Sequence, residues 1–459
     1  MVRKPNAFLY FIAFILIYPV LKILFCLKVD RSCCKLPKGP YIVLSNHESF
    51  IDFLLVMLAL YPHRLNAVTA QKYFNFRPLN WLLPLMGAIP KYLFETDMHA
   101  VFSIMKVIRR GDRLLIFPEG RDSVHGPYMG MIKSTGKLIK KLQVPVLSCN
   151  IEGSYNCAPF WRKGFRCGRI RVTFANLFSE EDIQRLTVEE INNQIDVRLS
   201  GKDVVLAQES PLEPPLEEPR REPRREPLDE PLKEPQRETM EEQSLKEFRR
   251  NTSSSPKKPL TLLREKKLAE GLENILYYCP VCQREFTLET RDNTISCTAC
   301  RSRATMDRKS VFSAHGEGAF PKTIADWYKA QVLHERQKLQ EDIDLVRAEV
   351  LVSMPLDGGR GFTIRGNGTL RLDNKGWHFD GELDGEKTQL FFPINTVPVV
   401  PFEPNYSIQI CRGKDFYDFI PRDNPRASAK YATIGECAYW RFASNIQITP
   451  GKDSGFSQA

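Results

Sequence analysis

Residues 44–52 read LSNHESFID and connect a strand-like apolar run to a helix-like apolar run. Within this stretch His47 stands five residues before Asp52. Residues five apart on a regular helix lie roughly 140° apart around its axis, at about 100° per residue, so these side chains pair only if His47 precedes the helix. We therefore expect His47 in the connection and Asp52 one turn into the helix, where its carboxylate reaches the imidazole and fixes the tautomer.

The same stretch has a purely structural interpretation. Asn46 and Ser49 are both good N-cap residues, and a capping segment would leave the histidine without a catalytic role.

The surrounding chain favours a folded domain in either case. From Tyr41 to about Leu199, apolar strand-like runs (YIVLS, RLLIFP, VPVLSCNI, RIRVTFA) alternate with helix-like runs (FIDFLLVMLAL, MHAVFSIMKVIRR, STGKLIKKL). This alternation predicts an α/β domain with a central sheet.

Three blocks of this region occur together in a fixed order. The first is NHxSxxD, here Asn46, His47, Ser49 and Asp52; the second is FPEG at residues 117–120; the third is a VPV segment that contains Pro145. In this order and at these distances they resemble the glycerophospholipid acyltransferase family, whose best-known members are 1-acylglycerol-3-phosphate acyltransferases. The resemblance covers roughly residues 40–200.

The resemblance implies an acyltransferase-type central sheet with flanking helices. It also implies an O-acyltransferase that moves a fatty acyl group from acyl-CoA or acyl-carrier protein to the hydroxyl of a lysophospholipid, with 1-acylglycerol-3-phosphate as the expected acceptor. His47, held by Asp52, would take the proton of that hydroxyl as it attacks the thioester, without an acyl-enzyme.

Further residues are expected to bind the substrate on the strength of the resemblance. They are Asn46, Ser49, Lys91, Glu119, Gly120, Arg121, Lys133 and Pro145, with Lys137 beside Lys133. Lys133 and Lys137 have a solvated helix face as their alternative interpretation. The chain departs from the family twice. The arginine expected two residues after FPEG is replaced by Asp122, so Arg121 is the substitute, and Lys91 stands in for an arginine expected where Leu93 lies. Asp122 would repel a phosphate, so we expect it to point away or to pair with a cation such as Lys133.

The run from Phe8 to Cys26 is broken only by Pro19 and Lys22 and approaches the length that a bilayer core requires. It predicts a membrane segment that either spans the bilayer or enters one leaflet. A cleaved signal is the less favoured alternative, because no small-x-small site follows. Basic residues after the run outnumber those before it, which places the following domain on the cytoplasmic side of the membrane.

Four of the twelve cysteines form two C-x2-C pairs, Cys279 with Cys282 and Cys297 with Cys300, separated by 14 residues. Two such knuckles suit one tetrahedral Zn²⁺, and the hairpin-like segment between them resembles a zinc ribbon. We expect a structural zinc, with a redox pair or a nucleic-acid reader as alternatives. The other eight cysteines show no disulfide framework, which agrees with a reducing compartment.

The remaining segments differ in composition and in predicted secondary structure. A proline at every fourth position from Pro211 to Pro235 removes helix hydrogen bonds and predicts an extended or disordered linker. Residues 326–350 read as an amphipathic helix. Short strands follow, with a turn at Asp373–Gly376 and a closing helix after Asn424 and Pro425, and together they resemble a pleckstrin-homology or GRAM-like module.

The predicted organisation is therefore modular. It runs as a membrane anchor (1–38), an acyltransferase domain (39–205), a Glu/Pro-rich disordered linker (206–270), a zinc ribbon (271–310), a helical connector (311–350) and a small β-rich domain (351–445). Residues 1–200 hold 27 Lys and Arg against 15 Asp and Glu, which is +12, and the rest hold 38 against 40, which is −2. The basic half suits membrane lipids as partners, and the C-terminal charge argues against nucleic acid. A non-catalytic membrane scaffold that keeps the fold is the alternative function.

Overall fold

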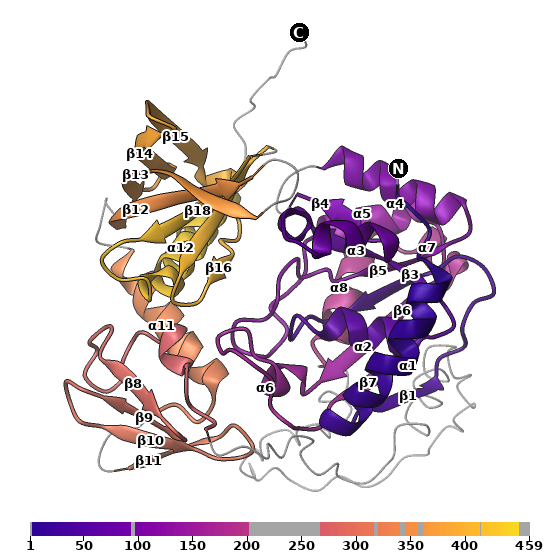
Figure 1. Cartoon of the computed structure of the whole chain (residues 1–459), viewed down its shortest axis with the longest axis horizontal. Coiled ribbons are helices and arrows are strands. Elements are labelled where there is room, and N and C mark those ends of the chain that lie inside the picture. Colours follow the sequence, from indigo (N-terminus) through magenta and orange to yellow (C-terminus); the bar gives the residue numbers. More distant parts are fainter. Residues whose placement is uncertain are drawn as a thin grey trace, which may run out of the picture. The chain divides into compact units, whose positions relative to one another are not determined.

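The apolar run that leads into the quoted stretch forms strand β2 (Ile42–Ser45), near the centre of a seven-stranded sheet. Figure 1 labels its two neighbours in this sheet, β5 and β6. The strand order is β1-β7-β6-β2-β5-β3-β4. Strands β5 and β6 flank β2 and run parallel to it, whereas β7 is antiparallel to β6. The other strands are β1 (Lys28–Cys33), β3 (Leu65–Ala70), β4 (Ile89–Lys91), β5 (Arg113–Ile116), β6 (Val146–Glu152) and β7 (Arg171–Phe178).

Helices cover both faces of this sheet because the side chains of β2 alternate between two apolar clusters. Val43 belongs to the cluster that includes residues of α1 and α2, whereas Ile42 and Leu44 belong to the cluster of α4, α5 and α8. The helical elements of this half are α1 (Ala7–Leu24), α2 (Asp52–Ala59), η1 (Gln71–Asn75), α3 (Leu79–Leu85), α4 (Met98–Arg109), α5 (Ser134–Leu142), α6 (Ser154–Cys157), α7 (Glu180–Arg185) and α8 (Val188–Leu199). The predicted mixed α/β architecture is confirmed.

Helix α1 lies against this sheet domain. The Tyr10 hydroxyl donates to the carbonyl of Leu65 over 2.8 Å and accepts from its N–H over 3.0 Å, and Tyr10 is fully buried. Strand β1, inside the segment predicted as an anchor, pairs in parallel with β7. In the described part of the chain, α1 is the one helix that is long and apolar enough to cross a membrane.

The structure is a computed structural model, and it describes residues 2–92, 97–201, 267–315, 320–339, 345–356, 361–413 and 415–448. Most of the predicted linker, residues 206–266, lies outside the described residues. The described residues of Met1–Ser200 and Leu260–Ala459 belong to one compact unit.

The segment with the paired cysteines is a small antiparallel sheet after a short 3-10 helix, η2 (Leu272–Asn274). Its strand order is β11-β10-β9-β8, with β8 (Leu288–Arg291), β9 (Thr294–Cys297), β10 (Arg303–Met306) and β11 (Phe312–His315). Strands β8 and β9 form the hairpin that the sequence predicted between the two cysteine pairs.

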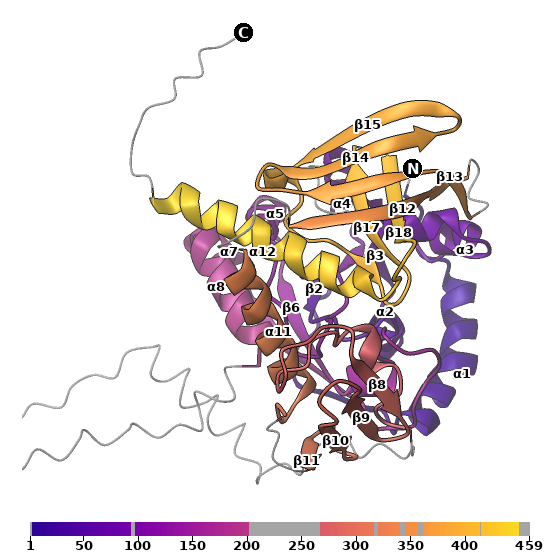
Figure 2. The same cartoon turned by 90° about the vertical axis from the view of Figure 1, so that its left-hand side faces the viewer.

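The C-terminal part is a seven-stranded antiparallel sheet of order β15-β14-β13-β12-β18-β17-β16. Helix α11 (Ile324–Lys338) precedes it, and helix α12 (Ala427–Ile448) follows it and packs on α11 and on β16 to β18 (Figure 2). The strands are β12 (Val346–Pro355), β13 (Phe362–Leu372), β14 (Gly376–Leu383), β15 (Glu386–Pro393), β16 (Phe402–Glu403), β17 (Ser407–Arg412) and β18 (Asp415–Pro421), with η3 (Ile394–Thr396) after β15.

Two predictions for this part have different outcomes. The turn at Asp373–Gly376 is confirmed, because it joins β13 to β14. The helix over residues 326–350 is wrong at its C-terminal end, where residues 346–350 begin β12. A β-rich C-terminal region is therefore present, and its pleckstrin-homology or GRAM-like identity stays a prediction.

Candidate active site

His47 lies in the connection between β2 and α2, directly after the strand and ahead of the helix. Its Nδ1 is 3.1 Å from Oδ2 of Asp52, the first residue of α2. The same carboxylate oxygen accepts the backbone N–H of Ser49 over 2.8 Å, and Asp52 is fully buried. Because a carboxylate accepts, His47 carries a proton on Nδ1, and the pair has the geometry that the sequence predicted.

A second loop, after strand β5, holds His47 from the other side. The imidazole stacks on the Phe117 ring with centroids 4.1 Å apart. The backbone N–H of His47 donates to Oε1 of Glu119 over 2.7 Å, and its carbonyl accepts from the N–H of Ser123 over 2.8 Å. Glu119 also accepts the Met129 N–H over 2.8 Å. Glu119 thus joins two loops by hydrogen bonds to backbone donors.

The other imidazole nitrogen faces a second carboxylate. Nε2 of His47 is 2.9 Å from Oδ1 of Asp122. The expectation that Asp122 points away from the site is wrong, and the expected pairing with a nearby cation is made with the imidazole of His47 and not with Lys133. The physical reason is the turn at Gly120, whose φ of +73° brings the residues after FPEG back over the imidazole.

These two carboxylates control the charge of the imidazole. Burial by itself would lower the pKa of His47, but the charge and hydrogen bond of Asp122, with those of Asp52, raise it to about 10. Burial acts against ionisation of Asp122 too, yet the positive charges of His47 and Lys72 lower its pKa. The two carboxyl groups thus favour the protonated imidazole, while burial raises the pKa of Asp52 although its hydrogen bond to His47 opposes the rise.

Two neighbouring carboxyl groups have raised pKa values because they are buried. Burial raises the pKa of Glu119 to about 7, although its backbone hydrogen bonds oppose the rise. Burial and the charge of Asp52 raise the pKa of Glu48 to about 8. Glu48 accepts the Ser154 hydroxyl and the Tyr155 N–H, both over 3.1 Å. The site therefore carries several acidic groups close to the imidazole.

Arg121, the residue expected to meet a phosphate, is paired with the C-terminal helix α12. Its guanidinium donates to both carboxylate oxygens of Glu436, with Nη2 to Oε2 at 3.0 Å. The two side chains are only 14% and 15% exposed. This is the two-pronged geometry that a planar guanidinium forms with a carboxylate.

Lys72, in η1, is a second cation near Asp122. Its Nζ donates to Oε1 of Gln409 over 3.0 Å and lies 3.8 Å from Oε1 of Glu403. Burial opposes ionisation, but the charges of Tyr73, Glu403 and Asp122 raise the pKa of Lys72. Gln409 and Glu403 belong to the C-terminal sheet, so that sheet supplies partners for Lys72 as α12 does for Arg121.

Several predicted binding residues make contacts with backbone instead of lining an open site. Asn46 exchanges two hydrogen bonds with Ile151, at 2.8 and 2.7 Å, and the Ser49 hydroxyl donates to the Ala158 carbonyl over 2.6 Å. Neither residue caps α2, so the capping interpretation is wrong. Their binding role stays a prediction.

The other predicted binding residues are dispersed. The Pro145 carbonyl accepts the Ile42 N–H over 3.0 Å, and Nζ of Lys91 donates to the Tyr92 carbonyl over 3.1 Å. Lys133 and Lys137 are exposed at the start of α5. The structure thus brings together His47, Asp52, Glu119, Gly120 and Arg121, and it adds Asp122, Lys72 and Glu436. Only Asp122 carried a sequence signal, as a departure from the family block.

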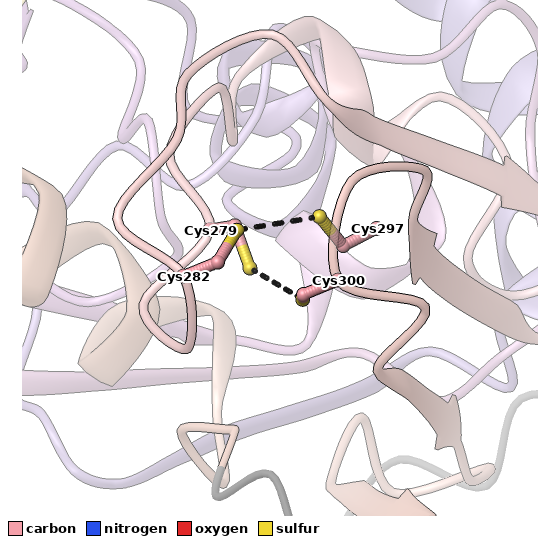
Figure 3. Close-up of side chains that lie close together, drawn as sticks. All are labelled: Cys279, Cys282, Cys297 and Cys300. Atoms are coloured by element: carbon pink, nitrogen blue, oxygen red, sulfur yellow. Dashed lines mark hydrogen bonds between the residues drawn. The ribbon is translucent and has the colours of Figure 1, made fainter.

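The four paired cysteines converge on one point (Figure 3). Sγ of Cys279 and Cys300 are 3.8 Å apart, and those of Cys282 and Cys297 are 3.7 Å apart. Sulfur ligands about 2.3 Å from a tetrahedral Zn²⁺ would be about 3.8 Å from each other. Burial opposes ionisation of Cys297, but hydrogen bonds from Thr287 and two backbone N–H groups lower its pKa to about 6, whereas burial raises the pKa of Cys279 and of Cys282. The spacing of the four sulfur atoms is what fits zinc.

Residues 30–152 match the family model described as Acyltransferase. This segment of the chain is therefore similar to acyltransferases. It is 24% identical over 136 residues to the chloroplastic 1-acyl-sn-glycerol-3-phosphate acyltransferase BAT2 of Brassica napus. That alignment covers 29% of this chain and 39% of the relative, so the chain spans well under half the length of the protein it matches.

A solved structure is also similar to part of the chain. It is the 1-acyl-sn-glycerophosphate acyltransferase PlsC from Thermotoga maritima, which is 22% identical. The match covers 40% of this chain and 73% of that chain, with a TM-score of 0.34. His47, Asp52, Glu119 and Asp122 all lie within the segment that the family model matches.

Proposed function

We propose that this chain transfers a fatty acyl group from an acyl thioester to the hydroxyl of a lysophospholipid. The observation that supports it best is the 3.1 Å contact of Nδ1 of His47 with Asp52 at the start of α2, inside the matched acyltransferase segment. In the neutral imidazole such a pair fixes one tautomer and leaves Nε2 as the basic atom, so the ring must first lose the Nε2 proton that Asp122 stabilises. The donor would be acyl-CoA or acyl-carrier protein.

The proposed reaction needs no covalent enzyme intermediate. As Nε2 of His47 takes the proton of the acceptor hydroxyl, the oxygen attacks the thioester carbonyl and a C–O bond forms. The C–S bond then breaks, and the thiol leaves with the proton that His47 returns. Asp122 lies 2.9 Å from Nε2, so the acceptor hydroxyl must displace that carboxylate before it reaches the base.

Helix α1 supports attachment to a membrane surface. Its outward side chains are strongly exposed and apolar: Phe8 is 68%, Leu16 62% and Ile23 79% exposed. Tyr10 and Leu21 on its other side are buried against the domain. A helix fixed along its domain in this way favours insertion along one leaflet, with the domain at the face of that leaflet. The basic residues after α1 favour the cytoplasmic face.

The cysteine cluster would hold one Zn²⁺ through Cys279, Cys282, Cys297 and Cys300. In a four-thiolate site the ion has a structural role, because all four tetrahedral positions are filled by protein ligands. It would stabilise the small sheet β8–β11, whose two cysteine pairs flank the hairpin.

The deciding experiment is mass spectrometry of products. The purified chain in mixed micelles is incubated with acyl-CoA or acyl-carrier protein and a panel of lysophospholipids that includes 1-acylglycerol-3-phosphate. The proposal expects a diacyl product that forms with time and that is absent with a His47→Ala variant. A His99→Ala variant is the matched control, because His99 is exposed on α4. Absence of product with every donor and acceptor would contradict the proposal.

A non-catalytic scaffold is the second candidate. The observation that favours it is that Nε2 of His47 and the guanidinium of Arg121 both meet carboxylates, those of Asp122 and Glu436. A scaffold would bind lipid without turnover. Product formation that depends on His47 excludes this candidate, whereas lipid binding by the wild type without any turnover supports it.

A further inference from the structure

The contact between Arg121 and Glu436 joins the loop after FPEG to a helix 315 residues further along the chain. Each of the two terminal nitrogens of Arg121 donates to a different carboxylate oxygen of Glu436. A partly buried pair of this geometry occupies the hydrogen-bonding edge of the guanidinium that would otherwise bind a phosphate. The positive charge of Arg121 is therefore compensated within the fold.

Glu436 is held in place by its surroundings. Its Oε1 also accepts the Val400 N–H over 3.4 Å. The preceding residue, Gly435, is packed so closely that a Cβ there would lie 2.9 Å from atoms of Trp377 and Val400. This close contact fixes helix α12 on the sheet at the level of Glu436. The Glu436 carboxylate is thus held in place by the close packing of α12, unlike that of a flexible side chain on the surface.

Lys72 repeats the pattern at a second position. Its Nζ meets Gln409 at 3.0 Å and Glu403 at 3.8 Å, and its charge also acts on Asp122. The C-terminal module therefore supplies hydrogen-bond acceptors to two cations of the acyltransferase domain, Lys72 and Arg121. A dianionic phosphate at this site would find Arg121 and Lys72 already bound to groups of the C-terminal module. It would also lie near the carboxylate of Asp122 at Nε2 of His47.

Building on the proposed function, we infer that Glu436 is a specificity-determining residue of the acyltransferase site. By compensating Arg121, it disfavours acceptors that carry a dianionic phosphate monoester. The favoured acceptors are hydroxyl lipids without that group: zwitterionic lysophospholipids, whose phosphate is a diester, and uncharged monoacylglycerols. The C-terminal module thereby takes part in acceptor selection.

The test is a competition in one tube. Full-length wild type, Glu436→Gln and Glu436→Asp are each given acyl-CoA with equal amounts of 1-acylglycerol-3-phosphate and 1-acylglycerophosphocholine in mixed micelles, and the two products are quantified. Glu386→Gln, on the exposed edge strand β15, is the matched control. A ratio of products does not depend on how much of each variant is folded.

The expected result is that wild type and Glu386→Gln favour the zwitterionic acceptor. Glu436→Gln should shift the ratio about tenfold or more toward the phosphate monoester, the size of a charge-assisted hydrogen bond. Glu436→Asp, which keeps a carboxylate, should stay closer to wild type. An unchanged ratio in Glu436→Gln, or a wild type that already prefers the phosphate monoester, would overturn the inference.

Failure of the proposed function would be visible separately, as absence of both products in every protein. The inference is then decided by binding of the same two radiolabelled lysolipids in detergent micelles. Stronger binding of the phosphate monoester by Glu436→Gln than by wild type supports it, and equal binding overturns it.

Discussion

Nε2 of His47 and Oδ1 of Asp122 lie 2.9 Å apart. Asp122 therefore occupies the nitrogen through which a general base would take a proton from its substrate. Because Nδ1 of the same ring meets Asp52, the imidazole is stabilised in its charged form. An imidazolium accepts no proton, so catalysis at this site depends on removing either the proton or the contact with Asp122.

The first prediction concerns the pH dependence of the reaction. With the pKa of His47 raised to about 10, kcat/KM for the acceptor should rise about tenfold per pH unit through the neutral range and level off only near pH 10. Asp122→Asn removes the largest favourable cause of the shift, so its profile should level off at lower pH. At pH 7 the variant should exceed wild type by at least about tenfold.

The groups that raise the pKa of His47 are Asp122 and Asp52. The charge of His47 acts in turn on Glu119, and Lys72 acts on Asp122. A pH series of initial rates measures the effect, with Glu382→Gln at an exposed position of β14 as the control. Superimposable profiles of wild type and Asp122→Asn would show that Asp122 does not govern the base.

The raised pKa of His47 also makes folding stability depend on pH. The folded-state pKa of His47 is raised above its ordinary value of 6.5, so protonation of His47 stabilises the folded state. This contribution is fully present below about pH 6.5 and is lost as pH rises through about 10. Urea denaturation should therefore show that Asp122→Asn is less stable than wild type at pH 6, and that the difference shrinks toward pH 10. A difference that grows with pH would contradict this.

Removal of the proposed base should abolish turnover without unfolding the domain. General-base catalysis contributes about 10² to 10⁴ in rate, so His47→Ala should lose at least about 100-fold, and Asp52→Asn should lose strongly because the tautomer is no longer fixed. Circular dichroism and micelle binding should match wild type for His47→Ala. Turnover by His47→Ala at the parental rate would show that the proposed mechanism is wrong.

The parts of the fold that could be predicted have strong local signals. Strand β2 is four consecutive buried residues, and the hairpin β8–β9 lies between two cysteine pairs. Strand β1 was missed because it reads KVDRSC and is mostly exposed at the sheet edge, so it shows neither an apolar run nor alternation. The end of the helix predicted over residues 326–350 was misplaced because residues 346–350 begin β12, whose pairing with β18, Val350 with Pro421, is not local.

The candidate site divides in the same way. The pairing of His47 with Asp52 follows from spacing at a strand–helix connection, whereas the partner of Arg121 lies 315 residues away on α12. No pattern within one segment shows a contact between distant segments. The orientation of Asp122 depends on the backbone turn at Gly120, with φ of +73°. The sequence PEGRD is compatible with this turn but does not predict it.

The cysteine cluster should bind one Zn²⁺ per chain. Metal analysis of the full chain by mass spectrometry should give a ratio near one, and Cys282→Ser or Cys300→Ser should lower it sharply, whereas Cys33→Ser, an exposed cysteine of β1, should not. A chelator should lower the melting temperature, since the binding energy of a structural metal contributes to folding. A metal-free chain with unchanged melting would contradict the assignment.

The last prediction separates membrane attachment from folding. Leu16 and Ile23 lie on the outward side of α1, at 62% and 79% exposure, so charges there cost the folded domain little. Burying an apolar side chain of this size in lipid contributes about 1.5 to 3 kcal/mol. Leu16→Glu combined with Ile23→Glu should therefore lower the fraction that floats with anionic liposomes at least about tenfold. Ile364→Glu, at a site that is 56% exposed in the C-terminal sheet, is the matched control and should float as wild type does. Since α1 is fixed to the domain through Tyr10, the double variant should keep its melting temperature and its activity toward acceptors presented in detergent. Equal flotation of the double variant and the control would show that α1 is not the membrane contact.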